Sequence, residues 1–141
     1  MSLKELTWKY HQDAERTEHA RKLLKGMEPE EYHKYLCNQY EIYTVLEKQA
    51  SDWGVLVGIE NIKRADKILA DIEELEAENP DLIKHADDEI GELICRTTVD
   101  YIRYVNKLTD YNRLLAHIYV RHFGDMYGGQ MIAKRNPGSG K

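Results

Sequence analysis

Apolar and small residues recur every three or four positions along most of the chain, a spacing that places them on one face of an α-helix. The clearest stretch runs from Leu3 to Leu24 and predicts one amphipathic helix, which ends at Gly26. A second helix is expected to open at Pro29, because proline is tolerated in the first helical turn. The first half of the chain is therefore predicted to form long helices.

The second half of the chain shows the same periodicity after a predicted loop over residues 51–58. Thr97, with Asp100 three residues later, resembles a capping arrangement for a helix that ends at Leu108, and Asp110 is placed to cap the next one. Further helices are expected over residues 60–77, 82–94 and 112–134. Since the sequence has no alternating strand pattern, it predicts an all-α fold.

Composition narrows the functional classes. The chain has 141 residues, which fits a single domain, predicted over residues 1–135 with residues 136–141 as a flexible tail. Its net charge of −5 disfavours nucleic-acid binding. We see neither the ~18–20 apolar residues of a membrane span nor the apolar core of a signal peptide. The isolated thiols Cys37 and Cys95 suit a reducing cytosol or an equivalent compartment. We expect a soluble, cytoplasmic protein and, separately, a monomer.

Chemistry-bearing side chains form a stripe beside the apolar face of the first predicted helix. Lys4, Trp8, His11, Glu15 and Glu18 follow one another at steps of three and four residues. Glu15 lies one turn from His11, where a carboxylate can orient an imidazole and raise its basicity, as it does for metal-bound histidines. The alternative interpretation is an exposed charged face.

Three glycines interrupt the last predicted helix. Each of Gly124, Gly128 and Gly129 costs roughly 1 kcal/mol in a helix interior, which favours a purpose for the missing side chains. Gly124 and Gly128 are four residues apart and share a face, so a helix that is bare on that face can bend and let a flat ligand touch its backbone. The alternative is that Gly124 ends the helix in an ordinary turn.

Two segments resemble the haem oxygenase family. Residues 3–15 resemble its proximal helix, and residues 116–125 with Gly128-Gly129-Gln130 resemble its distal helix; the likeness extends along nearly the whole chain. The resemblance implies an all-helical fold that holds haem between the first helix and a glycine-kinked distal helix. It also implies the oxidation of haem at a meso carbon to biliverdin, carbon monoxide and ferrous iron, with O2 and external electrons.

On this resemblance haem is both cofactor and substrate. His11 would be the iron ligand, Glu15 its hydrogen-bond partner and Lys4 a contact of a haem propionate. The remaining haem-binding positions would be Tyr119, Gly124, Gly128 and Gly129, and the catalytic ones Asp125, Tyr43 and Arg121. Asp125 would order a water beside the bound oxygen, so that a proton is delivered without a strong acid.

The chain also departs from the family pattern. Tyr127 stands where many members carry serine, which adds bulk near the distal side. Members of the family continue with further helices, whereas this sequence ends at Lys141, so we expect C-terminal helices to be missing. The resemblance is to soluble bacterial, plastid or phage-type members, which adds the plastid stroma or a host cytoplasm as expected compartments. A ferredoxin is the expected electron donor, docked near Lys4, Lys134 and Arg135. The alternative is that Lys134 and Arg135 are helix C-terminal charges favoured by the helix dipole.

Two other functions remain open on the same scaffold. A non-enzymatic haem carrier would use His11 and Lys4 but would give Asp125 no role. A thiaminase-type hydrolase would need a nucleophilic cysteine, and the apolar surroundings of Cys37 and Cys95 disfavour that.

Overall fold

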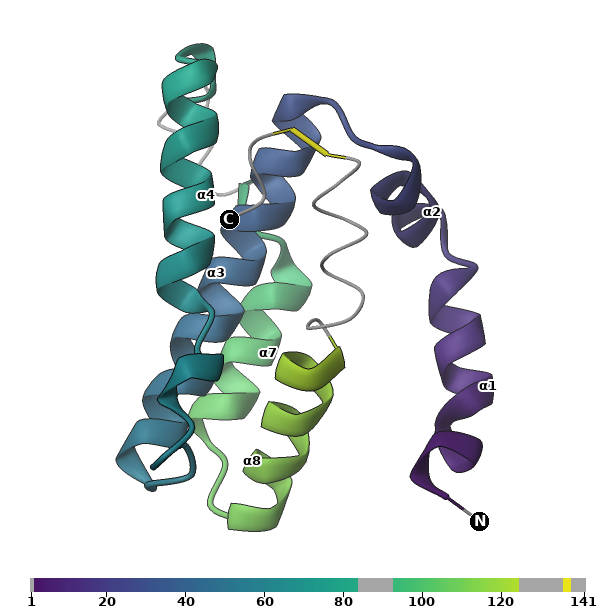
Figure 1. The fold of residues 1–141 in the computed structure, drawn as a ribbon, viewed down its shortest axis with the longest axis vertical. Coiled ribbons are helices and arrows are strands. Elements are labelled where there is room, and N and C mark those ends of the chain that lie inside the picture. Colours follow the sequence, from purple (N-terminus) through teal and green to yellow (C-terminus); the bar gives the residue numbers. More distant parts are fainter. Residues whose placement is uncertain (1, 84–92, 125–135, 138–141) are drawn as a thin grey trace.

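The computed structural model describes residues 2–83, 93–124 and 136–137, and every regular element in these ranges is helical (Figure 1). This confirms the all-α prediction. The elements in chain order are α1 (Leu3–Glu15), α2 (Glu18–Lys25), α3 (Pro29–Asp52), the 3₁₀ turn η1 (Glu60–Ile62), α4 (Ala65–Glu78), α7 (Arg96–Asn106), α8 (Tyr111–Ile118) and the π-helical turn η2 (Tyr119–Phe123).

The long helix α3 forms the centre of the bundle, with α4 on one side and α7 and α8 on the other (Figure 1). Toward α7 and α8 it contributes Ile42, Val45, Leu46 and Ala50 to one apolar cluster. Toward α4 it contributes Tyr32, Leu36 and Tyr43 to a second cluster. Because its apolar positions lie on two faces rather than one, α3 is buried from both sides.

The predicted single helix over Leu3 to Leu24 is wrong, because the chain breaks it into α1 and α2. The hydroxyl of Thr17 accepts a hydrogen bond from the backbone N–H of Ala20 at 3.2 Å and starts a new helix. Threonine side chains compete for backbone groups in this way, so a cap can form inside a periodic apolar pattern. The predicted end at Gly26 is confirmed, since this residue is the C-cap of α2.

The apolar face of α1 does not enter the core. No residue of α1 is buried, and Leu3, Leu6 and Tyr10 are 58%, 55% and 74% exposed. In Figure 1, α1 and α2 stand beside the bundle formed by α3, α4, α7 and α8. The periodicity thus identified a helix whose apolar side chains remain open to a ligand.

The predicted cap at Thr97 is also wrong. Helix α7 begins at Arg96 after Cys95, whose side chain makes no capping bond. The start of α7 is stabilised instead by Asn38 of α3. Its Oδ1 accepts hydrogen bonds from the backbone N–H of Cys95 at 2.9 Å and from the hydroxyl of Thr98 at 2.7 Å. A cap supplied from another helix leaves no local sequence signal.

Other boundaries agree better with the sequence. Asp110 caps α8 as predicted, because its carboxylate accepts from the backbone N–H of Asn112 at 2.9 Å. The helix predicted over residues 60–77 starts only at Ala65, after η1, and ends at Glu78. Most of the helix predicted over 82–94 lies outside the described residues. None of the described helices has the length and apolar character that crossing a bilayer requires.

Candidate functional site

The predicted proximal pair forms on α1. Nε2 of His11 lies 2.8 Å from Oε1 of Glu15, and the two side chains are 59% and 57% exposed. The indole of Trp8 stacks on the imidazole, with the ring centroids 5.7 Å apart and an interplanar angle of 23°. The imidazole is therefore oriented by a carboxylate and an aromatic ring while it stays accessible to a ligand.

The rest of the predicted stripe is only partly retained. Lys4 is exposed on the same helix, seven residues before His11. Glu18 belongs to α2, because the chain breaks before it, and there it lies 4.0 Å from Lys22. The structure therefore keeps Lys4, His11 and Glu15 on one helix and places Glu18 on another.

On the bundle side, Tyr43 and Arg121 are brought together. The hydroxyl of Tyr43, which is only 1% exposed, donates a hydrogen bond to the backbone carbonyl of Arg121 at 3.0 Å. The guanidinium of Arg121 turns elsewhere and lies 5.1 Å from the centre of the Tyr101 ring. Tyr43 therefore holds the backbone of this segment rather than the charge of Arg121.

The segment before the glycines is a π-helical turn, η2, which follows α8 directly. Gly124 continues with helical backbone angles of φ −60° and ψ −45°, and a Cβ placed there would meet nothing within 4 Å. Gly124 itself keeps helical backbone angles, and whether the helix ends directly after it concerns residues outside the described ones. π-helical turns widen a helix locally and are frequent at functional sites. Asp125, Gly128 and Gly129 lie outside the described residues, as do Tyr127, Lys134 and Arg135.

Two buried residues that the sequence did not single out as a pair join at η2. His122 is 0% exposed, and its Nε2 lies 3.4 Å from Oε1 of Glu47, while Nδ1 lies 3.2 Å from the carbonyl of Ile118. The structure therefore shows His122 as a histidine satisfied inside the protein. Helical spacing could have placed Glu47 with Tyr43 on one face of α3, one turn apart.

The carboxylate of Glu47 also starts α4. It accepts hydrogen bonds from the backbone N–H of Arg64 and, at 3.1 Å, from that of Ala65. Burial by itself raises the pKa of Glu47, but the bonds from His122 and these two amides outweigh it and hold the pKa below its ordinary value. One buried anion therefore ties η2 to the beginning of α4.

A second polar contact lies next to η2. The hydroxyl of Tyr101 is 2.8 Å from Nδ1 of His117, and burial raises the pKa of Tyr101 although Arg121 partly offsets this. Burial, followed by the charge of Arg121, lowers the pKa of His117. His117 is therefore a neutral acceptor for Tyr101 near pH 7.

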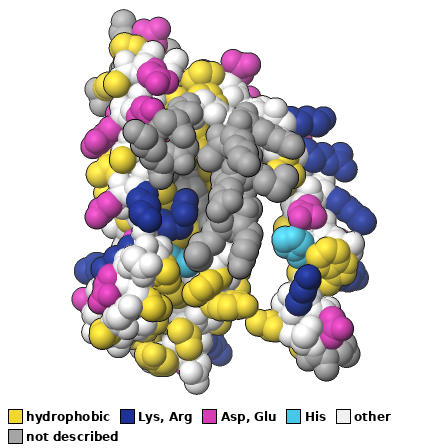
Figure 2. Space-filling model, viewed as in Figure 1, with side chains coloured by type: hydrophobic (Ala, Val, Ile, Leu, Met, Phe, Trp, Pro, Cys, Tyr) yellow, Lys and Arg dark blue, Asp and Glu magenta, His cyan; other side chains and the backbone are white. Residues whose placement is uncertain are grey.

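Exposed apolar side chains gather on both α1 and the end of the bundle that includes α8. Figure 2 shows hydrophobic side chains on α1 and over the lower part of the bundle. The large exposed hydrophobic side chains of these elements are Leu3, Leu6, Trp8 and Tyr10 on α1, and Tyr111, Leu115, Tyr119, Val120 and Phe123 on α8 and η2, each at least 39% exposed. A contiguous exposed apolar surface marks an interaction or ligand site. Tyr119, a predicted haem contact, belongs to this surface.

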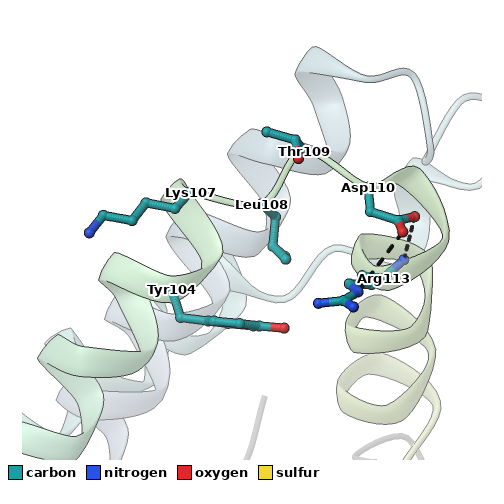
Figure 3. A pocket seen from close by; sticks show the side chains of 6 residues that line it. All are labelled: Tyr104, Lys107, Leu108, Thr109, Asp110 and Arg113. Carbon is teal, nitrogen blue, oxygen red and sulfur yellow. Dashed lines mark hydrogen bonds and ion pairs between the residues drawn. The ribbon is translucent and has the colours of Figure 1, made fainter.

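The cavity shown in Figure 3 lies elsewhere, at the connection between α7 and α8. It has a volume of about 340 Å³ and is lined by Tyr104, Lys107, Leu108, Thr109, Asp110 and Arg113. None of the predicted site residues lines it. Arg113 is already engaged by Asp110 at 3.9 Å, so the cavity adds nothing to the predicted site.

Cys37 is not an activated thiol. Sγ of Cys37 lies 3.7 Å from Nε2 of His33, but the same nitrogen also contacts Glu76 at 2.9 Å, so the three do not form a relay through both ring nitrogens. Burial, with the charges of Glu76 and Glu41, raises the pKa of Cys37 to about 11. A thiol in this state is a poor nucleophile, which argues against the thiaminase-type alternative.

Within the described part of the chain, no group of three or more His, Cys, Asp or Glu side chains is arranged to hold a metal ion. The family model described as Heme oxygenase matches residues 1–139. Neither the curated proteins nor the solved structures searched contain a match.

Proposed function

Because the chain belongs to the heme oxygenase family, we propose that it cleaves haem at a meso carbon to biliverdin, carbon monoxide and ferrous iron. O2 and electrons from an external donor would be the co-substrates. The observation that carries the proposal is the His11–Glu15 pair, with the two groups 2.8 Å apart, on a helix whose apolar side chains are exposed.

The residues present fit haem. Porphyrin supplies four nitrogen ligands to its iron, so the protein needs to provide only one side chain, and a histidine oriented by a carboxylate is a usual choice. The exposed apolar side chains of α1 and η2 offer cover for a flat apolar macrocycle, whose burial is worth about 25 cal/mol per Å². Lys4 is exposed on α1 and offers a cation for a propionate.

We assign His11 to the iron through the ring nitrogen that does not face Glu15. Glu15 holds the ring in orientation and increases its basicity. When bound, haem supplies the iron at which oxygen is activated and the ring that is oxidised. The single protein ligand leaves the opposite face of the site to η2 and the glycines that follow it.

On that opposite face we assign the proton handling to Asp125, supported by Tyr43, which holds the backbone of Arg121. An ionised carboxylate only accepts hydrogen bonds, so Asp125 would orient a water whose own proton points into the site. Gly124, Gly128 and Gly129 would let the backbone approach the ligand, and the open space around Gly124 supports this for the first of them.

For the electron donor we propose an acidic ferredoxin that docks on Lys4, Lys134 and Arg135, with a monomeric enzyme in the cytoplasm or an equivalent compartment. Exposed charges act mainly by steering association, so reversing the charge of Lys134 should slow the reaction with the donor most at low ionic strength. If the reaction rate with the donor is independent of salt in both the wild type and the Lys134 charge-reversal variant, this docking site is refuted.

The proposal is tested by adding haemin to the protein, recording the visible spectrum, and then supplying a reductant and oxygen. A histidine-ligated haem spectrum followed by the appearance of biliverdin is the expected result. A stable complex without turnover would instead establish the non-enzymatic carrier, and the absence of any complex would remove haem from the function.

A further inference from the structure

The surroundings of His122 determine its protonation. Its Nδ1 faces the backbone carbonyl of Ile118 and its Nε2 faces the carboxylate of Glu47, at 3.2 and 3.4 Å. A carbonyl and an ionised carboxylate are both acceptors, so each ring nitrogen must carry a proton to make its contact. A neutral ring would turn a lone pair toward one of the two oxygens.

The alternative is that Glu47 itself carries the proton, and its other contacts argue against this. Its carboxylate accepts from the backbone N–H groups of Arg64 and Ala65, at the positive end of α4. Those donors favour the charged form of Glu47. The titratable groups that face the His122 ring in the described residues are Glu47 and Tyr43, and the edge of Tyr43 meets the ring with the centroids 4.9 Å apart.

We infer that His122 is a buried imidazolium paired with Glu47, and that this ion pair is the positioning element that fixes η2 over the ligand site. Two side chains one turn apart on α3 hold the turn: Tyr43 through the carbonyl of Arg121 and Glu47 through the ring of His122. Glu47 simultaneously anchors η2 to the start of α4. The part of the inference that concerns turnover rests on the proposed function.

The protonation of His122 is tested without haem. Nitrogen NMR of the imidazoles in the wild-type protein near pH 7 should show protons on both nitrogens of His122, and on one only in Glu47→Gln. Amide hydrogen exchange of residues 119–124 should become faster by about tenfold in Glu47→Gln, because a buried charge pair couples the two segments. A singly protonated His122 in the wild type, or unchanged exchange, would overturn the inference.

The control is a second His–Glu pair, which joins α3 to α4 and does not involve η2. Nε2 of His33 on α3 lies 2.9 Å from Oε1 of Glu76 on α4, and His33 is 3% exposed. His33→Gln should lower stability yet leave the exchange of residues 119–124 as in the wild type. If His33→Gln changes that exchange as much as Glu47→Gln does, the effect reports general loosening and the inference fails.

Turnover gives the second readout. Glu47→Gln and His122→Gln should bind haemin with a Kd close to that of the wild type, but cleave it about tenfold more slowly and with an altered ratio of biliverdin isomers, because η2 is misplaced. His33→Gln should keep the wild-type ratio. An unchanged cleavage rate and isomer ratio in both Glu47→Gln and His122→Gln would contradict the positioning role. If the wild-type protein binds no haemin, the proposed function is contradicted. The NMR result then still decides whether the ion pair exists.

Discussion

His11 and Glu15 lie one helical turn apart on α1, with Nε2 of the imidazole 2.8 Å from a carboxylate oxygen. The contact is made by two exposed side chains of one helix, so it does not depend on the packing of the bundle. A carboxylate in this position can orient an imidazole.

Replacing His11 with alanine should abolish the histidine-ligated spectrum of the haemin complex. In the described residues, His11 is the imidazole that α1 pairs with a carboxylate, so its loss removes the assigned ligand. The measurement is a haemin titration followed by visible absorption. His19→Ala, which removes an exposed imidazole from α2, should retain the wild-type spectrum; an unchanged spectrum in His11→Ala would exclude His11 as the ligand.

Glu15→Ala should still bind haemin, with affinity or turnover reduced by about 10–100-fold, because the ring of His11 loses the carboxylate that orients it. Haemin titration and the rate of biliverdin formation measure the two effects. Glu18→Ala is the matched control, since Glu18 is 88% exposed and stands on the separate helix α2. Equal values for wild type and Glu15→Ala would refute the assigned role of Glu15.

Replacing Asp125 should affect the reaction more than haem binding. Asp125→Asn keeps the size of the side chain and loses its charge, and Asp125→Ala also removes the acceptor. Loss of a positioned proton relay typically costs about 10²–10⁴-fold, so biliverdin formation should fall steeply in the alanine variant while haemin still binds. A lower melting temperature with normal biliverdin yield would show that Asp125 only supports the local backbone.

The depressed pKa of Glu47 predicts how stability depends on pH. In the unfolded chain this carboxyl titrates near its ordinary value of ~4.3, and in the folded protein its pKa is lower. The stabilisation is therefore complete above the unfolded value and is lost as the pH falls through the folded one. Urea unfolding between about pH 3 and pH 7 should show a steeper acid loss in wild type than in Glu47→Gln. If stability falls equally with pH in the wild type and in Glu47→Gln, the predicted contribution of Glu47 is contradicted.

The raised pKa of Cys37 predicts a slow thiol. With a pKa of about 11, only on the order of 0.1% of this thiol is ionised near pH 8, so alkylation should be far slower than that of a free cysteine. Measured in a Cys95→Ser background, Glu76→Gln should speed the reaction because one of the charges that raise the pKa is gone. Rapid labelling of the Cys95→Ser protein that keeps Glu76 would reopen a role for Cys37 as a nucleophile.

The sequence predicted the elements whose signals are local. Pro29 begins α3 and Asp110 caps α8, as expected, because a proline and a capping carboxylate act within one turn of their own position. The likeness to a proximal helix correctly placed His11 and Glu15 together, since residues four apart on a helix are neighbours. These contacts need no knowledge of the tertiary fold.

The features that the sequence missed depend on partners distant along the chain. Asn38 holds the start of α7 from 57 residues away, and Glu47 meets His122 across 75 residues. The break at Thr17 was missed for a different reason, because the apolar spacing continues across it while the hydroxyl caps the new helix. Periodicity reports which face is apolar and cannot report where the hydrogen-bond ladder is interrupted.

The separation of α1 from the core divides the thermodynamics of this chain into two parts. Since α1 buries no side chain, the cooperative unfolding of the bundle is set by α3, α4, α7 and α8, and the unbound α1 should exchange its amide hydrogens close to the rate of an open helix. A ligand that covers α1 would therefore raise the protection of residues 3–15 far more than it raises the melting temperature. Substitutions on α1 can therefore change which ligand it binds while the free energy of unfolding of the bundle stays nearly the same.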